Sequence, residues 1–127
     1  MNDYVDIAVG IILDGNRFLV EKRTGDNDID PDLICLPGGH LDLNETLEEC
    51  VKREMEEEFG IIINDPQFIC KSPYIHSNGE KAMLHYFVIK KYHGEIKSTE
   101  ASYVYWESNP NNLSTAVDRE ALSKLNL

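Results

Sequence analysis

A single helical segment set between β-rich stretches constrains the fold of this chain more than any other feature. Residues 45–59 carry apolar side chains at every fourth position, namely Leu47, Val51, Met55 and Phe59. This spacing lines one face of an α-helix, and Gly60 directly after it provides a C-terminal stop. The chain therefore has to supply a β-sheet surface against which this amphipathic helix can pack.

Most of the remaining sequence predicts strands. Apolar, β-branched and aromatic residues are concentrated in the segments 5–13, 17–23, 33–36, 61–63, 67–76, 81–92 and 102–106. Asp14-Gly15 is a hairpin turn signal between the first two segments, whereas residues 37–44 are a predicted loop. Residues 111–127 are predicted to form a closing helix. The order of strands, helix, strands and helix indicates an α/β or α+β fold, in which helices pack on a mostly antiparallel or mixed sheet.

Composition and charge exclude several classes of function. The chain has 127 residues, 42% of them hydrophobic, which suits one domain spanning residues 1–127 with one core. Its net charge of −11 would repel a nucleic-acid duplex. The longest apolar run, residues 7–13, is too short to span a bilayer, and residues 1–6 lack the basic start of a signal peptide. We therefore expect a cytoplasmic protein, a monomer or a homodimer, with no duplex or membrane partner.

The segment 53–58, with the sequence REMEEE, concentrates negative charge on the predicted helix. Glu54, Glu57 and Glu58 are spaced i, i+3, i+4 and share one flank, which turns toward the core at Glu58. Glu56 is expected to face solvent. Clustered, partly buried carboxylates repel one another and lose hydration, and Arg53 alone cannot neutralise three of them. The flank is either a solvated helix face or a site for Mg²⁺ or Mn²⁺, which prefer hard oxygen ligands.

The loop ahead of the helix favours the second interpretation. Pro37, Gly38 and Gly39 lead toward the helix N-terminus. Glycines let backbone groups approach a ligand closely, and a helix N-terminus favours anions. A Gly-rich loop beside an acidic helix therefore predicts a site for phosphate groups and metal ions. The metal would allow an acidic protein to bind an anionic substrate.

These residues resemble the signature of a known family, the Nudix hydrolases, and in particular its MutT-like members. Every fixed position of the 23-residue Nudix box is matched, by Gly39, Glu45, Arg53, Glu54, Met55, Glu57, Glu58, Gly60 and Ile61. The resemblance implies an α/β/α sandwich with a mixed sheet. It also implies hydrolysis of a nucleoside diphosphate linked to another moiety. Relatives often have glycine where this chain has Asn44, and asparagine also tolerates left-handed backbone, so we expect an active enzyme.

The resemblance also implies the roles of individual residues. The metal ligands would be Glu54, Glu57, Glu58 and, as an additional ligand, the backbone carbonyl of Gly38. Arg53 would orient the carboxylates, and Glu45 would support the junction between loop and helix. All of these would act around bound Mg²⁺ (or Mn²⁺), where a metal-bound water would be the nucleophile.

A further glutamate after the box often completes the metal set or acts as the base in this family. Glu100 is our candidate because it lies six residues before Trp106, where a MutT-like member carries such a glutamate. Glu107 and Glu95 are the alternatives, and an ordinary surface role for Glu100 also stays open.

Contacts to the substrate are predicted at Arg23, Gly39, His40 and Asp118. Asp118 falls about where a MutT-like enzyme recognises the base edge and could accept hydrogen bonds from a guanine-like N–H pair. The alternative is a helix charge in an N-terminal turn. Arg23 matches a phosphate-contacting arginine of that group, and His40 is either a phosphate contact or an exposed loop residue. Packing is expected to outweigh base stacking for the aromatic and histidine residues of the central strands, Tyr74, His76, His85 and Tyr86.

The predicted substrate is a small-molecule nucleotide. The MutT-like resemblance implies a (deoxy)nucleoside triphosphate, or an oxidised form of one, converted to the monophosphate and pyrophosphate. The alternative with the same chemistry is ADP-ribose or another nucleotide sugar, and the alternative without chemistry is a nucleotide-sensing module. A calcium buffer is disfavoured because the glutamates lie on a helix and not in an EF-hand loop.

Overall fold

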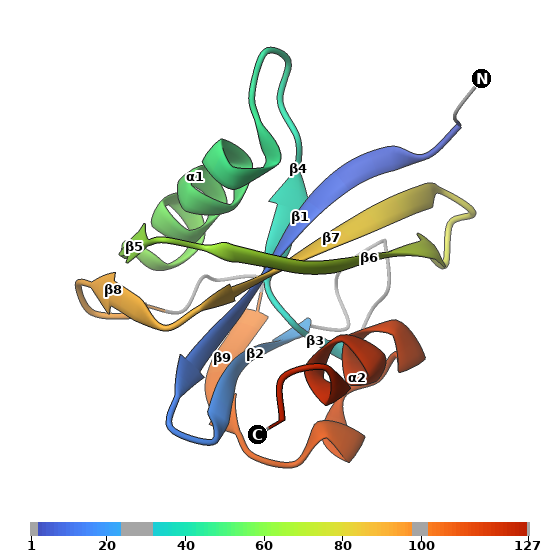
Figure 1. Ribbon diagram of the computed structural model, residues 1–127. Helices are drawn as coiled ribbons and strands as arrows, with labels where there is room; N and C mark the ends of the chain where they lie inside the picture. The colour runs from blue at the N-terminus through green and yellow to red at the C-terminus, as the bar shows by residue number, and fades with distance from the viewer. Residues whose placement is uncertain (1–2, 24–31, 98–101, 127) are drawn as a thin grey trace.

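Two helices cover opposite faces of a mixed β-sheet in the computed structural model, which describes residues 3–23, 32–97 and 102–126 (Figure 1). The large sheet contains β1 (Val5–Asp14), β2 (Arg17–Arg23), β3 (Ile34–Cys35), β4 (Gly38–His40), β6 (Gln67–Ile75), β7 (Lys81–Ile89) and β9 (Ser102–Glu107). Strands β5 (Ile62–Asn64) and β8 (Lys91–His93) form a separate pair. The helices are α1 (Leu47–Phe59) and α2 (Ala116–Ser123). The predicted α+β organisation is confirmed.

Strand β1 organises the sheet because it contacts three other strands. It runs parallel to β7 along its length, and antiparallel to β4, with Ile7 opposite His40. Its pairing with β2 is confined to the hairpin, where Leu13 lies opposite Phe18. Beyond the hairpin, β2 pairs with β3 and β9. Strand β4 therefore takes the place beside β1 that β2 has left, and it carries the Gly-rich segment into the middle of the fold.

Successive side chains of β1 point to opposite faces of the sheet and so divide the core into two layers. Ile7, Val9 and Ile11 pack with residues of α2, whereas Ala8 and Ile12 pack with residues of α1. The helix α1 lies close against the strand at Gly10, where a Cβ would come within 2.9 Å of Ile89 Cδ1 and 3.3 Å of Met55 Sδ. The two helices are therefore fixed on opposite faces by the period-2 pattern of one strand.

Several boundaries differ from those predicted from the sequence. The segment 81–92, predicted as one strand, is divided between β7 in the large sheet and β8 in the separate pair. Helix α1 begins at Leu47 and not at residue 45, because Thr46 and Glu49 form a capping box that ends the loop there. Within the predicted loop 37–44, the segment Gly38–His40 pairs with β1 as a strand. The predicted closing helix is shorter than 111–127, since Pro110–Asn112 form a 3-10 turn and Thr115 caps α2. Neither α1 nor α2, the helices of the described ranges, is long and apolar enough to cross a membrane.

Candidate active site

A cavity of about 390 Å³ lies between α1, strand β4 and the first turn of α2. Its walls include apolar side chains from the sheet, such as Ile7, Val9 and Leu84. Of the residues predicted to form the site, Arg23, Gly38, Gly39, His40, Glu54, Glu58 and Asp118 all line this cavity. A partly apolar cavity with a few convergent polar groups is the usual form of a small-molecule site.

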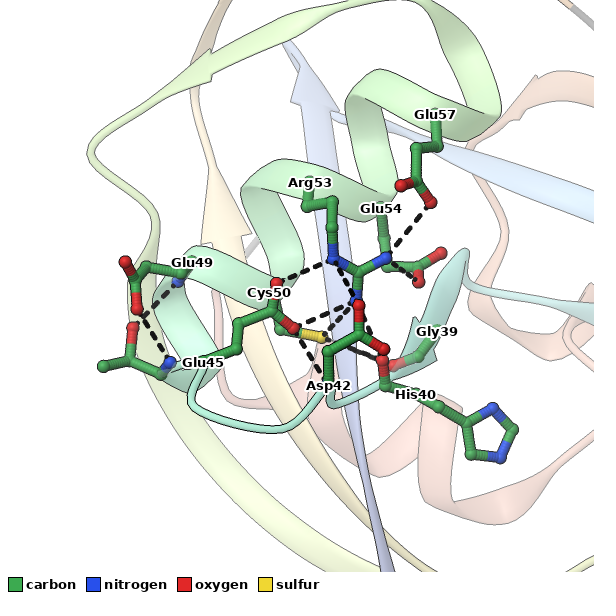
Figure 2. Close-up of polar contacts among 10 residues, drawn as sticks. Gly39, His40, Asp42, Glu45, Glu49, Cys50, Arg53, Glu54 and Glu57 are labelled. Carbon is green, nitrogen blue, oxygen red and sulfur yellow. Dashed lines mark hydrogen bonds and ion pairs between the residues drawn. The ribbon is translucent and has the colours of Figure 1, made fainter.

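Arg53 lies among the carboxylates of the acidic helix (Figure 2). Its Nε donates to Glu45 Oε2 at 2.7 Å, and its Nη1 donates to Glu54 Oε1 at 2.8 Å and to Glu57 Oε2 at 3.1 Å. Its Nη2 donates to the backbone carbonyl of His40 at 3.0 Å. The hydrogen bond from Arg53 is the main reason why the pKa of Glu45 is lowered to about 2. One guanidinium therefore holds three carboxylates and the end of β4 together.

Glu45 also closes the loop between β4 and α1. The backbone N–H of Asp42 donates to Glu45 Oε1 at 3.0 Å. Asn44 has a φ of +65°, which confirms that the residue standing in for glycine here has the left-handed backbone that asparagine tolerates. Glu45 thus connects the loop to Arg53 at the point where the helix begins.

The glutamates of the predicted metal set differ in exposure. The side chain of Glu54 is 12% exposed and that of Glu57 is 60% exposed. Glu58 is half-buried, and burial raises its pKa, with the charges of Glu54 and Glu57 adding to the effect. Glu56 is exposed, as the helical spacing predicts. Glu54 and Glu58 line the cavity, whereas Glu57 does not and is instead paired with Arg53.

Gly39 allows the Glu54 carboxylate to lie directly against the backbone of β4. A Cβ at Gly39 would overlap Cδ and Oε2 of Glu54 and would come within 2.5 Å of its Oε1. Any side chain at this position would displace the carboxylate. The glycine that the sequence places at the start of the acidic motif thus makes room for one of its glutamates.

The donor set is suited to a divalent cation. Over residues 3–23, 32–97 and 102–126, no three His, Cys, Asp or Glu side chains converge into a preformed metal cage. Mg²⁺ is usually held by one or two carboxylates together with waters and substrate phosphates. Glu54 and Glu58 on the wall of one cavity meet that requirement. The pKa of Glu58 is raised first by burial and then by the charges of Glu54 and Glu57, and a bound cation would oppose this rise by favouring the ionised carboxylate.

Asp118 lies at a different part of the cavity wall and is only 4% exposed. Its Oδ1 accepts a hydrogen bond from the Tyr86 hydroxyl at 2.6 Å, and its Oδ2 accepts one from the backbone N–H of Leu36 at 3.0 Å. Burial raises the pKa of Asp118. The hydrogen bond to Tyr86 was not foreseen from the sequence, where no local pattern relates a strand residue to a helix residue so far along the chain.

The aromatic and histidine residues of the sheet, for which packing was expected, are divided between cavity and core. Tyr74 and His76 line the cavity, whereas His85 and Tyr86 are packed in the sheet, as expected. The imidazole of His85 lies 2.9 Å from Asp6 Oδ1. His40 faces the cavity with its Nε2 3.3 Å from Glu80 Oε1.

The candidate base Glu100 lies outside the described residues. Of its alternatives, Glu107 accepts hydrogen bonds from the backbone N–H groups of Ser108 and Asn109 and from Asn112 Nδ2. These contacts lower the pKa of Glu107 and give it a local role in the turn after β9. Glu95 is exposed and does not line the cavity.

Comparisons with known proteins agree with this fold and site. The NUDIX domain model matches residues 5–123, so the chain belongs to the Nudix hydrolase family. It is 32% identical over 103 residues to the 8-oxo-dGTP diphosphatase of Buchnera aphidicola subsp. Schizaphis graminum, covering 81% of this chain and 76% of that protein. It is 30% identical over 105 residues to the 8-oxo-dGTP diphosphatase of Escherichia coli K12, covering 82% and 80%.

A solved structure supports the same assignment. The crystal structure of a MutT NUDIX hydrolase from Burkholderia pseudomallei superimposes with a TM-score of 0.84 and 25% identity, covering 98% of this chain and 99% of that one. The predicted family, with its hydrolase activity, is therefore confirmed. Nudix hydrolases generally use divalent metal ions, and the acidic flank of α1 is the part of this chain suited to them.

Proposed function

We propose that this Nudix hydrolase is a Mg²⁺- or Mn²⁺-dependent pyrophosphohydrolase of a nucleoside triphosphate. The favoured substrate is an oxidised deoxynucleoside triphosphate, which would yield the monophosphate and pyrophosphate. One observation carries the proposal: Glu54 and Glu58, the glycines of β4, Arg23 and the buried Asp118 share a single cavity. The two relatives at 32% and 30% identity are both named 8-oxo-dGTP diphosphatase, and these names favour the same substrate class.

In this proposal the residues of the cavity divide into two groups. Glu54, Glu57, Glu58 and the Gly38 carbonyl would hold the metal, which when bound neutralises phosphate charge and lowers the pKa of a coordinated water. Arg53 would keep the carboxylates in place through the hydrogen bonds that it donates to Glu54 and Glu57. Water would then attack one phosphorus of the α–β anhydride, a glutamate would take its proton, and the bridging oxygen would leave with the other phosphorus.

The remaining contacts would orient the nucleotide. Arg23 and His40 would contact phosphate oxygens, and Gly39 would let the polyphosphate approach the backbone. Asp118 would accept hydrogen bonds from the N–H groups of a guanine-type base edge. Its position on the cavity wall, apart from the acidic helix, suits recognition of the base at one end of a bound nucleotide and hydrolysis at the other.

The metal assignment is tested with substitutions that change charge but not size. Glu58→Gln and Glu57→Gln should lower turnover by about two or more orders of magnitude, because each removes an anionic ligand worth several kcal/mol in the transition state. Glu56→Gln is the matched control, since it makes the same change on the exposed side of the same helix. Near-normal turnover in both Glu57→Gln and Glu58→Gln, with unchanged Mg²⁺ titration by calorimetry, would overturn the assignment.

The substrate is tested with a panel of nucleotides. Release of pyrophosphate and phosphate would be measured with nucleoside triphosphates, oxidised triphosphates, ADP-ribose and nucleotide sugars. We expect the highest kcat/KM for a guanine-type or oxidised guanine-type triphosphate. Faster cleavage of ADP-ribose or a nucleotide sugar would replace the triphosphate assignment. Tight binding of one nucleotide without Mg²⁺- or Mn²⁺-dependent hydrolysis of any would indicate the sensing module.

A further inference from the structure

Tyr86 places a hydroxyl behind the cavity wall, inside the core. The residue lies on the central strand β7 and is fully buried. It does not line the cavity itself, but its hydroxyl donates to Asp118 Oδ1 at 2.6 Å. A buried hydroxyl needs a hydrogen-bonding partner, since leaving it without one is costly. Here the partner is the one carboxylate proposed to recognise the base.

We propose that Tyr86 is a positioning residue for substrate selection, whose hydroxyl fixes the Asp118 carboxylate as a hydrogen-bond acceptor facing the base. This inference rests on the proposed function of Asp118. It assigns a role to Tyr86, which belongs neither to the family signature nor to the lining of the cavity. Tyr86 acts through Asp118 and touches no substrate atom.

The contacts around Asp118 define what the carboxylate can offer to a ligand. Tyr86 donates to one oxygen and the Leu36 N–H donates to the other. Both hydrogen bonds favour the ionised carboxylate and oppose the rise in pKa that burial causes. The ionised carboxylate is an acceptor at both oxygens and has lone pairs left for further donors. A base edge with adjacent N–H groups matches it, whereas an edge that presents a ring-nitrogen acceptor leaves two acceptors face to face. A site built this way discriminates more strongly than an apolar one.

Asp118 also connects the base end of the cavity to the Gly-rich segment. Leu36 lies two residues before Gly38, and the next carbonyl, that of Pro37, accepts from the Gly10 N–H at 2.8 Å. A shift of the Asp118 side chain would therefore change its contact with the base and would also displace the backbone that leads to β4. The hydrogen bond from Tyr86 resists that shift through β7, a strand that is paired on both sides, with β1 and β6.

Tyr86→Phe tests the proposal because it removes one oxygen and keeps the ring that fills the core. The probes are dGTP, with two adjacent N–H donors on its base edge, and dITP, which lacks the exocyclic amino group. We expect a loss of about 10- to 100-fold in kcat/KM for dGTP, the range for a hydrogen bond to a charged group. The loss should lie in KM with kcat nearly unchanged, and the dGTP to dITP preference should fall. Binding of dGMP and dIMP by calorimetry gives the same comparison without hydrolysis.

Two further variants separate positioning from a merely structural bond. Tyr92→Phe removes a hydroxyl from a half-buried tyrosine that packs in the other core layer, and it should leave the dGTP to dITP preference unchanged. Asp118→Asn should lower that preference, and adding Tyr86→Phe to it should produce no further loss, since the two residues act as a unit.

The outcomes distinguish this inference from the proposed function. If Tyr86→Phe lowers the unfolding temperature but keeps the wild-type preference in both kinetics and dGMP binding, the bond only fixes α2 to the sheet and the inference is wrong. Additive losses in the double variant would contradict it as well. If Asp118→Asn itself keeps the wild-type preference, the base-recognition role of Asp118 is wrong, whatever Tyr86 does.

Discussion

Replacing Gly39 by alanine would displace the Glu54 carboxylate and leave the sheet in place. The new Cβ would overlap Glu54 Cδ and Oε2, and even the more distant Oε1, at 2.5 Å, would be about 0.9 Å inside an ordinary contact of 3.4 Å. The carboxylate therefore has to move by at least about 1 Å, and it moves at the end of a flexible side chain. A misplacement of about 1 Å in a catalytic site can cost about 100-fold in rate. We expect kcat to fall by about that factor.

The expected change in stability is small because the opposing contributions are of similar size. Moving Glu54 weakens its ion pair with Arg53, and such partly exposed pairs contribute about 0.2–1 kcal/mol. Alanine at a position with ordinary φ lowers the entropy of the unfolded chain and stabilises by about 0.4–1 kcal/mol. The free energy of unfolding of Gly39→Ala should therefore stay within about 1 kcal/mol of that of the wild type.

Gly38→Ala is the matched control, because the same added methyl group meets backbone instead of a side chain. Its Cβ would lie 2.5 Å from the Ala8 carbonyl oxygen and 3.1 Å from Val9 Cα, across the pairing of β4 with β1. Overpacking of this kind costs about 1–3 kcal/mol. Gly38→Ala should therefore lower the unfolding temperature by several degrees, at about 3–6 °C per kcal/mol for a chain of this size.

The assay combines Mg²⁺-dependent hydrolysis of the best nucleotide from the panel with thermal unfolding followed by circular dichroism. The two alanine variants should separate, with Gly39→Ala losing turnover at nearly wild-type stability. If Gly39→Ala keeps turnover within about threefold of the wild type, the position of the Glu54 carboxylate does not control hydrolysis. If Gly39→Ala loses as much stability as Gly38→Ala, the added methyl group damages the fold and does not simply displace the Glu54 carboxylate.

Three further predictions concern the fold around the site. The pKa of Glu45 in the folded protein is about 2, below its ordinary value of 4.5, so its stabilising contribution is present above about pH 4.5 and is lost as the pH falls toward 2. In urea unfolding at several pH values, Glu45→Gln should therefore lose less stability in acid than the wild type does, and an equal loss in the two proteins would contradict this. Phe59→Ala removes a fully buried ring from the α1 layer and should cost about 3–5 kcal/mol in urea unfolding, whereas a cost below about 1 kcal/mol would show that α1 is not anchored there. Burial raises the pKa of the Cys50 thiol to about 11, so Cys50 should resist alkylation at pH 8 until urea unfolds the protein, and rapid labelling of folded protein, located by mass spectrometry, would refute that environment.

The elements with strong periodicity could be predicted from the sequence, and those made by close backbone contact could not. The four-residue repeat from Leu47 to Phe59 identified α1, and the run of apolar, β-branched residues 5–13 followed by the Asp14-Gly15 turn identified the first hairpin. Strand β4 was predicted as a loop because glycine is depleted in strands. It pairs with β1 because Gly38 has no side chain to hold the backbones apart. The extent of α2 was overestimated because the apolar positions continue before the Thr115 cap.

The same distinction between local and long-range contacts separates the part of the cavity proposed to carry out hydrolysis from the part proposed to select the base. Arg53 reaches Glu54 and Glu57 within about one helical turn, so helical spacing brings these three groups together, and Glu45, in the loop just ahead of α1, lies only eight residues away along the chain. Asp118 meets Tyr86 across 32 residues and Leu36 across 82. Those contacts exist only after β7, α2 and the segment before β4 have packed. A single substitution such as Tyr86→Phe could therefore change the preferred base while every residue of the acidic motif stays the same, which is how one hydrolytic site can serve different nucleotides in related chains.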